Sequence, residues 1–145
     1  MSKHYNQGVW KPINEDKYRG NVDSIVYRSS WERRFFTWAD NAVDVVEWNS
    51  EEVVVPYISP VDNRPHRYFV DAWMKMANGK IYLVEIKPLK ETEPPKLPKS
   101  GRRTKGYMKS IETYAINQAK WKAAKLYSDK RGWEFTILTE RVLCR

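Results

Sequence analysis

Hydrophobic positions along the chain follow two periods, one typical of helices and the other typical of strands. A spacing of three to four residues begins after Ser29 and ends near Asn41, and it returns from Tyr107 to about Asp129. Pro56 interrupts one of the strand-like runs, which indicates an edge strand or a bulge there. These runs are rich in β-branched and aromatic residues and predict extended segments at residues 43–48, 51–58, 66–76, 80–87 and 133–139.

The clearest hairpin in the sequence is formed by the runs at 66–76 and 80–87, which are separated by Ala77-Asn78-Gly79. Both faces of these two strands are largely apolar, so we expect them to be central in a sheet and covered on two sides. The apolar residues predicted for one face are Phe69, Trp73, Ile81 and Leu83, and those predicted for the other are Val70, Met74, Val84 and Ile86.

The length of the hairpin loop decides which face of the sheet carries Asp71. A two-residue loop would place Asp71 and Glu85 on opposite faces. A three-residue loop, with Gly79 in the left-handed conformation, pairs Met76 with Lys80 and sets Asp71 opposite Glu85. We predict the three-residue loop.

Two other segments lack a regular pattern. Residues 1–28 mix glycine, proline, asparagine and charge with scattered aromatic residues, which indicates an irregular arm packed on the domain. Residues 88–106 contain four prolines and many basic side chains, which indicates a long basic loop. The predicted helices each place a row of residues on one side: Trp31, Phe35, Trp38 and Ala39 in the first helix, and Tyr107, Ile111, Tyr114, Gln118 and Trp121 in the second.

Length and cysteine content are those of an ordinary domain from a reducing compartment. The 145 residues are enough for one domain, residues 1–145, with a core of its own. The single cysteine, Cys144, has no intrachain partner, so we expect neither a disulfide nor a thiolate metal site, and a cytoplasmic location fits. No apolar run approaches the roughly 18 residues of a membrane span, and the start of the chain lacks a secretory signal.

The net charge of +8 is distributed unevenly along the chain. Residues 1–85 carry 11 basic and 12 acidic side chains, whereas residues 86–145 carry 15 basic and 6 acidic side chains. A basic surplus in one part of a chain suits a polyanionic partner, and nucleic acid is the commonest one. An anionic membrane or an acidic protein would also fit, but no amphipathic segment rich in lysine and tryptophan supports membrane binding.

The candidate chemistry lies on the predicted hairpin. Metal-assisted hydrolysis of a phosphodiester needs acidic groups that hold Mg²⁺ or Mn²⁺ through oxygen, and a nearby cation that orients the attacking water. Asp71, Glu85 and Lys87 offer this set, because Glu85 and Lys87 are two residues apart on one strand and point to the same face. Charged residues on strands are more often solvated, but these interrupt otherwise apolar strands, where an unpaired carboxylate costs several kcal/mol.

Two further side chains have competing interpretations. Glu32 lies on the same helical face as Phe35 and could reach the sheet, but Ser29 and Glu32 also match a capping box, in which the glutamate only accepts a hydrogen bond at the helix start. Gln118 interrupts an apolar helical face, so it could contact the site or the DNA backbone, or it could be a satisfied buried amide. His66 and His4 lack the spacing of a zinc site.

A strip of basic residues follows the candidate catalytic strand and suits contacts with DNA phosphates. The alternative is a solvated linker with no ligand. The residues of this strip are Lys96, Lys99, Arg102, Arg103, Lys105 and Lys109.

Four short motifs, in the order in which they occur, resemble those of the head completion nucleases of tailed phages and, more distantly, the N-terminal nuclease domain of TnsA-type transposition proteins. The motifs are Tyr27-Arg28-Ser29-Ser30-Trp31-Glu32, Val53-Val54-Val55-Pro56-Tyr57, His66-Arg67-Tyr68-Phe69-Val70-Asp71 and Val84-Glu85-Ile86-Lys87-Pro88, and the likeness covers roughly residues 8–140. The resemblance implies an α/β fold with a restriction-endonuclease-like core, in which a mixed β-sheet is flanked by helices.

The resemblance also implies roles for individual residues. It makes Asp71 and Glu85 the metal-binding pair, Glu32 a third acidic residue at the metal, and Lys87 the catalytic lysine of a PD-(D/E)xK nuclease. Val70 departs from the motif, which has proline at this position. The implied activity is a Mg²⁺-dependent endonuclease that cuts double-stranded DNA, acts on packaged DNA ends at the capsid portal, and leaves a 5′-phosphate.

Three functions remain open on the sequence. The first is the head completion nuclease, which would work in the host cytoplasm or in the head–neck region of the virion beside portal or neck proteins. The second is a structural head component that binds DNA and cuts little. The third is a nuclease of the same fold that is specific for a DNA sequence or a junction. Metal dependence and the effect of Asp71→Ala separate the first two.

Overall fold

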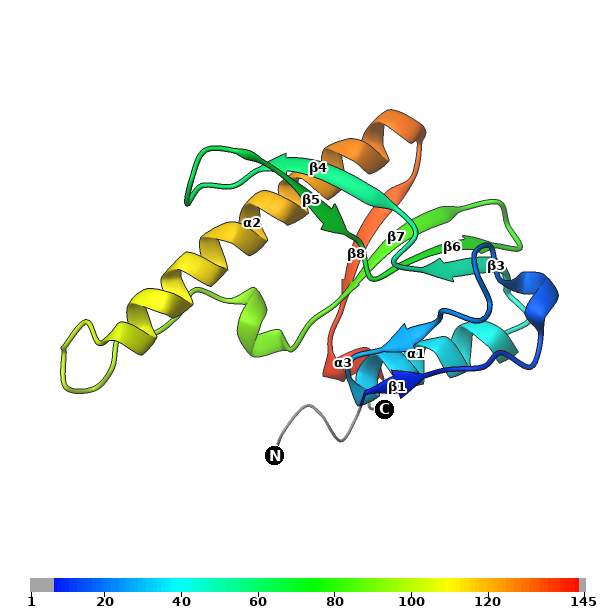
Figure 1. Ribbon diagram of the computed structural model, residues 1–145, viewed down its shortest axis with the longest axis horizontal. Coiled ribbons are helices and arrows are strands. Elements are labelled where there is room, and N and C mark those ends of the chain that lie inside the picture. Colours follow the sequence, from blue (N-terminus) through cyan, green and yellow to red (C-terminus); the bar gives the residue numbers. More distant parts are fainter. Residues whose placement is uncertain (1–6, 144–145) are drawn as a thin grey trace.

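A four-stranded mixed β-sheet forms the centre of the fold in the computed structural model, which describes residues 7–143 (Figure 1). The strand order is β3-β6-β7-β8, in which β6 is antiparallel to both β3 and β7 and β8 is parallel to β7. The predicted mixed sheet is therefore present. The strands are β3 (Val45–Ser50), β6 (Ala72–Met76), β7 (Ile81–Ile86) and β8 (Glu134–Leu138).

Helix α1 (Ser30–Asn41) packs on one face of this sheet, close to the predicted bounds. The Ser29 side chain accepts a hydrogen bond from the Glu32 backbone N–H and caps the helix start. Phe35 and Ala39 are buried as predicted, whereas Trp38 is 46% exposed. The sequence pattern missed two buried positions, Asp40 and Phe36, and Phe36 packs with Trp48 of β3.

Helix α2 (Lys105–Arg131) covers the opposite face, and Figure 1 shows its N-terminal half extending beyond the sheet. Thr104 caps its start, and Gly132, with φ of 72°, ends it in the left-handed conformation. Because one helix covers each face, the prediction that the central strands are covered on two sides is confirmed.

Of the two interpretations of Gln118 in the second helix, that of a buried amide is wrong. Gln118 is exposed, and its neighbour Asn117 is buried instead. A step of one residue rotates a side chain by about 100° around the helix, so only one of two adjacent amides faces the core. The residues of α2 that are buried are Asn117, Trp121, Ala124 and Ser128.

The run predicted as one strand over residues 66–76 is divided between two sheets. Its first part is β5 (Pro65–Phe69), which pairs with β4 (Val54–Ile58) in a separate two-stranded ribbon, and its second part is β6 of the main sheet. The chain bends at Val70 and Asp71, where it leaves the ribbon, and the alternation of faces shifts there. Val70 therefore packs with Leu83 under α2, and its predicted grouping with Met74 is wrong.

The three-residue hairpin loop is confirmed. The register pairs Trp73 with Leu83 and Lys75 with Ile81, and the Met76 backbone N–H donates to the Lys80 carbonyl at 2.8 Å. Gly79 has φ of +89°, in the left-handed region that the loop requires. Asp71 is consequently brought to the level of Glu85.

We predict that Gly79→Ala lowers the free energy of unfolding by about 1 kcal/mol, because an alanine at this positive φ is strained. Gly106→Ala is the matched control, since Gly106 lies in the first turn of α2 and its φ is not in the left-handed region. Urea unfolding of both variants measures the difference. Equal stability of Gly79→Ala and the wild type would contradict the assigned loop conformation.

The N-terminal arm packs along α1 and the edge of the sheet. Its side chains Tyr18 and Ile25 are buried in the same core as Phe35. The buried carboxylate of Asp40, near the end of α1, accepts hydrogen bonds from the backbone N–H groups of Ile13 and Asn14. The elements of the arm are β1 (Gly8–Val9), η2 (Glu15–Lys17) and β2 (Val26–Tyr27).

The segment between β7 and α2 contains one short 3₁₀ helix, η3 (Leu89–Thr92), and α3 (Glu140–Leu143) follows β8. Between residues 7 and 143, no helix is both long enough and apolar enough to cross a membrane. Residues 1–6 of the predicted arm, including His4, and Cys144 lie outside the described residues.

Candidate active site

Asp71 and Glu85 face one another between the ribbon and the main sheet. Asp71 lies in the bend before β6, and the Ile86 backbone N–H donates to its Oδ2 at 2.7 Å. Glu85, on β7, is only 5% exposed. Burial raises the pKa of Asp71 well above its ordinary value, and repulsion from the neighbouring Glu85 carboxylate raises it further. Two carboxylates in such a place are unfavourable without a compensating proton or cation.

Two buried donors hold the Glu85 carboxylate in place. The Tyr68 hydroxyl donates to Oε1 at 2.7 Å, and the Trp121 indole Nε1–H donates to Oε2 at 3.3 Å. Burial and the nearby negative charge of Glu85 raise the pKa of Tyr68, so its hydroxyl remains a donor. Residues from β5 and α2 thus fix the orientation of a carboxylate on β7.

Tyr68→Phe is expected to weaken divalent-metal binding and DNA cleavage by about 10–100-fold, because it removes one of the two donors that orient Glu85. Tyr57→Phe is the control: Tyr57 lies on the same ribbon, and the Lys120 ammonium lies over both tyrosine rings. Titration with Mn²⁺ and cleavage rates at several metal concentrations measure the effect. If excess metal does not restore any activity to Tyr68→Phe, the proposed positioning role is wrong.

Lys87 lies one residue beyond the end of β7, on the same side of the chain as Glu85. Its Nζ is 3.9 Å from Glu85 Oε2, and 27% of its side chain is exposed. The Lys87 backbone N–H donates to the Leu138 carbonyl, which anchors this position to the end of β8. The ammonium group is therefore beside the carboxylate pair and still open to a substrate.

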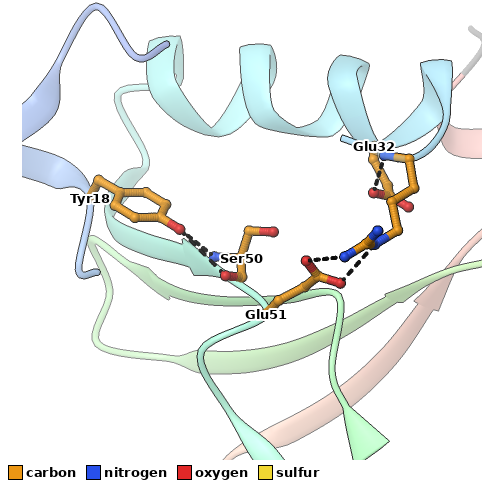
Figure 2. A network of polar contacts seen from close by, with 5 residues as sticks. Tyr18, Glu32, Ser50 and Glu51 are labelled. Carbon is orange, nitrogen blue, oxygen red and sulfur yellow. Dashed lines mark hydrogen bonds and ion pairs between the residues drawn. The ribbon is translucent and has the colours of Figure 1, made fainter. Parts of the chain in front are cut away.

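Glu32 forms only half of the predicted capping box. Its Oε2 accepts a hydrogen bond from the Arg28 backbone N–H at 2.9 Å, one residue before the Ser29 N–H that a capping box would use (Figure 2). It is also close enough to Asp71 and Glu85 for its charge to act on them. Burial raises the pKa of Glu32, and repulsion from Glu51 and Glu85 adds to the rise.

Sequence reasoning missed Arg28 and Glu51, which lie beside the carboxylates. The Arg28 guanidinium donates to both carboxylate oxygens of Glu51, at 3.1 and 3.3 Å (Figure 2). Glu51 has φ of +56°, which is uncommon for a non-glycine residue, and its backbone N–H donates to the Asp71 carbonyl. The pairing joins residues 23 positions apart, and only the adjacent Glu51-Glu52 at the start of an apolar run could have drawn attention to it.

Figure 2 also shows how the segment next to Glu51 is supported. The Tyr18 hydroxyl, from the N-terminal arm, contacts both the backbone N–H and the carbonyl of Ser50. The arm therefore reaches the strand end that precedes the Arg28–Glu51 ion pair.

The carboxylate pair fits a hard divalent cation in its chemistry. Asp71 and Glu85 supply oxygen donors, which Mg²⁺ prefers, and a bound cation would offset the repulsion of the two neighbouring carboxylates. Among residues 7–143, no group of three or more acidic, histidine or cysteine side chains is arranged to hold a metal ion. Mg²⁺ commonly takes one or two protein carboxylates and keeps several waters, so two donors are sufficient.

The structure places the predicted DNA-binding strip on the surface. Lys96, Lys99, Arg102 and Arg103 lie in the segment between η3 and α2, whereas Lys105 and Lys109 lie in the first turns of α2. All six are exposed, and within the described part of the chain none of them forms a salt bridge. Gln118, further along α2, is exposed as well.

Comparison with known proteins agrees with this architecture. Residues 42–140 match the family model described as TnsA-like endonuclease N terminal. This match identifies the class as an endonuclease domain with a restriction-endonuclease-like fold, and the chain belongs to the TnsA-like endonuclease family. The chain is also 44% identical over 135 residues to the head completion nuclease of Enterobacteria phage T4, covering 92% of this chain and 90% of the phage protein.

Proposed function

We propose that this protein is a metal-dependent DNA endonuclease of the PD-(D/E)xK type. The observation that carries the proposal is the pair of half-buried Asp71 and buried Glu85 with the Lys87 ammonium beside it. A nuclease related to phage enzymes needs such a set, because a phosphodiester is cut by water only when charge at the phosphate is compensated.

Asp71 and Glu85 are the residues that would hold Mg²⁺ or Mn²⁺, with Glu32 supporting the metal or its water. When bound, the metal would lower the pKa of a water ligand and compensate charge on the phosphate. Lys87 orients the attacking water or stabilises the developing charge, since its Nζ is next to Glu85 and partly exposed. The product proposed from the family resemblance is a 5′-phosphate.

The exposed basic strip would hold the DNA backbone. Its six cations carry no salt bridge in the described part of the chain, so they are free to contact phosphates. Because a relative sharing 44% identity is named a head completion nuclease, we propose action on packaged phage DNA ends before the tail is joined. Portal or neck proteins would then be partners, in the host cytoplasm or at the head–neck region of the virion.

The test is the cleavage of circular and linear duplex DNA by the wild-type protein with Mg²⁺, with Mn²⁺ and with EDTA. The proposal predicts metal-dependent nicking of the circle, because an endonuclease needs no free end. Binding of DNA without cutting under any metal condition would overturn the proposal and leave a structural head component as the function. Cutting of linear DNA alone would replace the endonuclease by an end-dependent nuclease.

A further inference from the structure

A groove of about 750 Å³ lies beside α2, outside the carboxylate site. One wall is the first half of α2, from Gly106 to Asn117, and the other is the proline-rich segment from Lys90 to Pro98. We call this feature the loop groove. Its volume lies in the range of small-ligand sites, which is about 300–1,000 Å³.

The most informative residue of the loop groove is Asn117. Asn117 is only 5% exposed, and it lines the groove. Within residues 7–143 its side-chain amide has no hydrogen-bond partner. Its amide atoms are not among the fully buried unpaired atoms of the described residues, so they open on the groove and can form hydrogen bonds with a ligand that has both donors and acceptors.

Two tyrosines line the groove on the same wall. Tyr107 and Tyr114 are seven residues apart on α2, which is about two helical turns, so both rings lie on one side of the helix. Both are half-buried, and in the described part of the chain neither ring packs against another aromatic ring. Tyrosine side chains that line a groove and are only half-buried are typical stacking positions for nucleobases.

The charge around the groove favours phosphate groups. Lys90, Lys96 and Lys109 line it, against the two acidic residues Glu91 and Glu93. Three more cations follow in the segment that leads to α2, in the yellow-green part of Figure 1, and a fourth begins the helix: Lys99, Arg102 and Arg103, and then Lys105. Stacking surfaces next to a basic surplus are the combination found in proteins that bind single-stranded nucleic acid.

The inner end of the loop groove lies close to the carboxylate pair. Asn117 is one helical turn before Trp121, whose indole donates to Glu85 at 3.3 Å. One turn of helix corresponds to about 5.4 Å along its axis. The groove therefore ends about one helical turn from a residue that contacts the carboxylate pair.

From these observations we infer that the loop groove binds an unpaired segment of a DNA strand next to the phosphate that is cut. This inference rests on the proposed nuclease function and names its substrate class: duplex DNA that carries a single-stranded end or flap. Tyr107 and Tyr114 stack on bases, Asn117 forms hydrogen bonds with a base edge, and the lysines contact phosphates. Bases inside a duplex are stacked on each other and cannot lie against these rings.

The binding test uses a fluorescent oligothymidylate of about 12 nucleotides, with anisotropy measured in EDTA so that cleavage plays no part. The double variant Tyr107→Ala/Tyr114→Ala is expected to bind at least about tenfold more weakly, because each stacked base contributes roughly 1–3 kcal/mol. The double variant Tyr107→Phe/Tyr114→Phe keeps the rings and is expected to bind like the wild type. Circular dichroism and thermal unfolding confirm that each variant is folded.

A second pair of variants tests the charge of the groove. Lys109→Ala removes a lysine that lines the groove, and Lys122→Ala removes an exposed lysine from a later turn of the same helix. Only Lys109→Ala is expected to weaken binding of the oligothymidylate and to lower the dependence of log K on log salt by roughly 0.7. If both substitutions weaken binding equally, binding depends on the net charge of the protein and not on the groove, and the inference is overturned.

Cleavage then separates this inference from the proposed function. Wild-type protein is expected to cut a duplex with a single-stranded flap faster than the matched blunt duplex, and the alanine double variant is expected to lose this preference. The wild type could cut DNA while the alanine and phenylalanine double variants bind the oligothymidylate with the same affinity. In that case the groove assignment is wrong and the nuclease function stands. If polyglutamate displaces the oligothymidylate at equal charge concentration, the groove binds acidic protein segments and the inference is overturned.

Discussion

Replacing Asp71 by asparagine is expected to stabilise the metal-free protein and to abolish its DNA cleavage. Burial and the repulsion from Glu85 make the Asp71 carboxylate unfavourable in the folded state, as its raised pKa indicates. An asparagine keeps an oxygen that can accept the Ile86 N–H and removes the charge. We expect a gain on the order of 1 kcal/mol without metal, or a Tm increase of roughly 2–5 °C.

The pH dependence of this stability difference has a definite sign. Because the pKa values of Asp71 and Glu32 are raised in the folded state, the folded protein holds these protons to higher pH than the unfolded chain does. The contribution of these two groups to the stability of the wild type in EDTA is therefore fully present below about pH 4, the ordinary carboxyl range, and is lost as the pH rises through the raised values. Asp71→Asn removes the larger part of this loss, so its stability advantage grows from pH 5 to pH 8.

Thermal unfolding in EDTA and in Mg²⁺ measures both parts of the Asp71 prediction. Mg²⁺ is expected to stabilise the wild type, because it binds the folded state alone, and to have little effect on Asp71→Asn. The same variant is expected to cut DNA at least about 10³-fold more slowly, since losing a metal ligand removes several kcal/mol of transition-state stabilisation. A variant that is less stable than the wild type in EDTA at pH 8 would show that Asp71 is a structural carboxylate.

Replacing Lys87 by methionine is expected to reduce cleavage by about 10²–10⁴-fold while leaving metal binding and folding nearly unchanged. Methionine keeps much of the aliphatic chain, and the interaction it removes inside the protein is a 3.9 Å contact with Glu85. The effect should therefore appear in the cleavage step and not in the affinity for Mn²⁺.

The matched control for Lys87 is Lys80→Met. Lys80 is an exposed lysine beside the hairpin loop, at the end of β7 that is remote from the carboxylate pair. Single-turnover cleavage and Mn²⁺ titration of both variants make the comparison. If Lys87→Met loses metal binding in proportion to its activity, the lysine supports the metal site and has no separate role in hydrolysis.

The position of the site could be predicted from the sequence because a local feature determines it. The turn chemistry of Gly79 selects the three-residue loop, and the loop sets the register that brings Asp71 to Glu85. Ser29 likewise predicts the start of α1, because a cap depends only on the residues around it. Patterns of this kind act within a few residues and survive in the folded protein.

Features that depend on distant parts of the chain could not be predicted in the same way. The division of residues 66–76 between two sheets follows from pairing with β4, and apolar alternation alone does not show where a strand changes partner. The choice of Asn117 over Gln118 as the buried amide depends on how α2 lies on the sheet. The ion pair of Arg28 and Glu51 requires two segments that meet only in the folded structure.

The likeness to known nucleases and the geometry of the site support different conclusions. The family match gives the fold and the class of enzyme. The contacts of Glu85 with Tyr68 and Trp121, the pair with Asp71, and the unpaired amide of Asn117 belong to this chain and make the proposals testable residue by residue.

The central claim is that the Asp71–Glu85 pair binds a divalent metal that drives phosphodiester hydrolysis. Its most direct test is the single-turnover rate of nicking of supercoiled circular DNA in Mg²⁺, for the wild type and for folded Glu85→Gln protein. If the pair binds such a metal, the wild type nicks the circle in Mg²⁺ and does not nick it in EDTA. The rate of Glu85→Gln is then at least about 10³-fold lower than that of the wild type. Nicking by Glu85→Gln at the wild-type rate, with the same dependence on Mg²⁺, would contradict this claim.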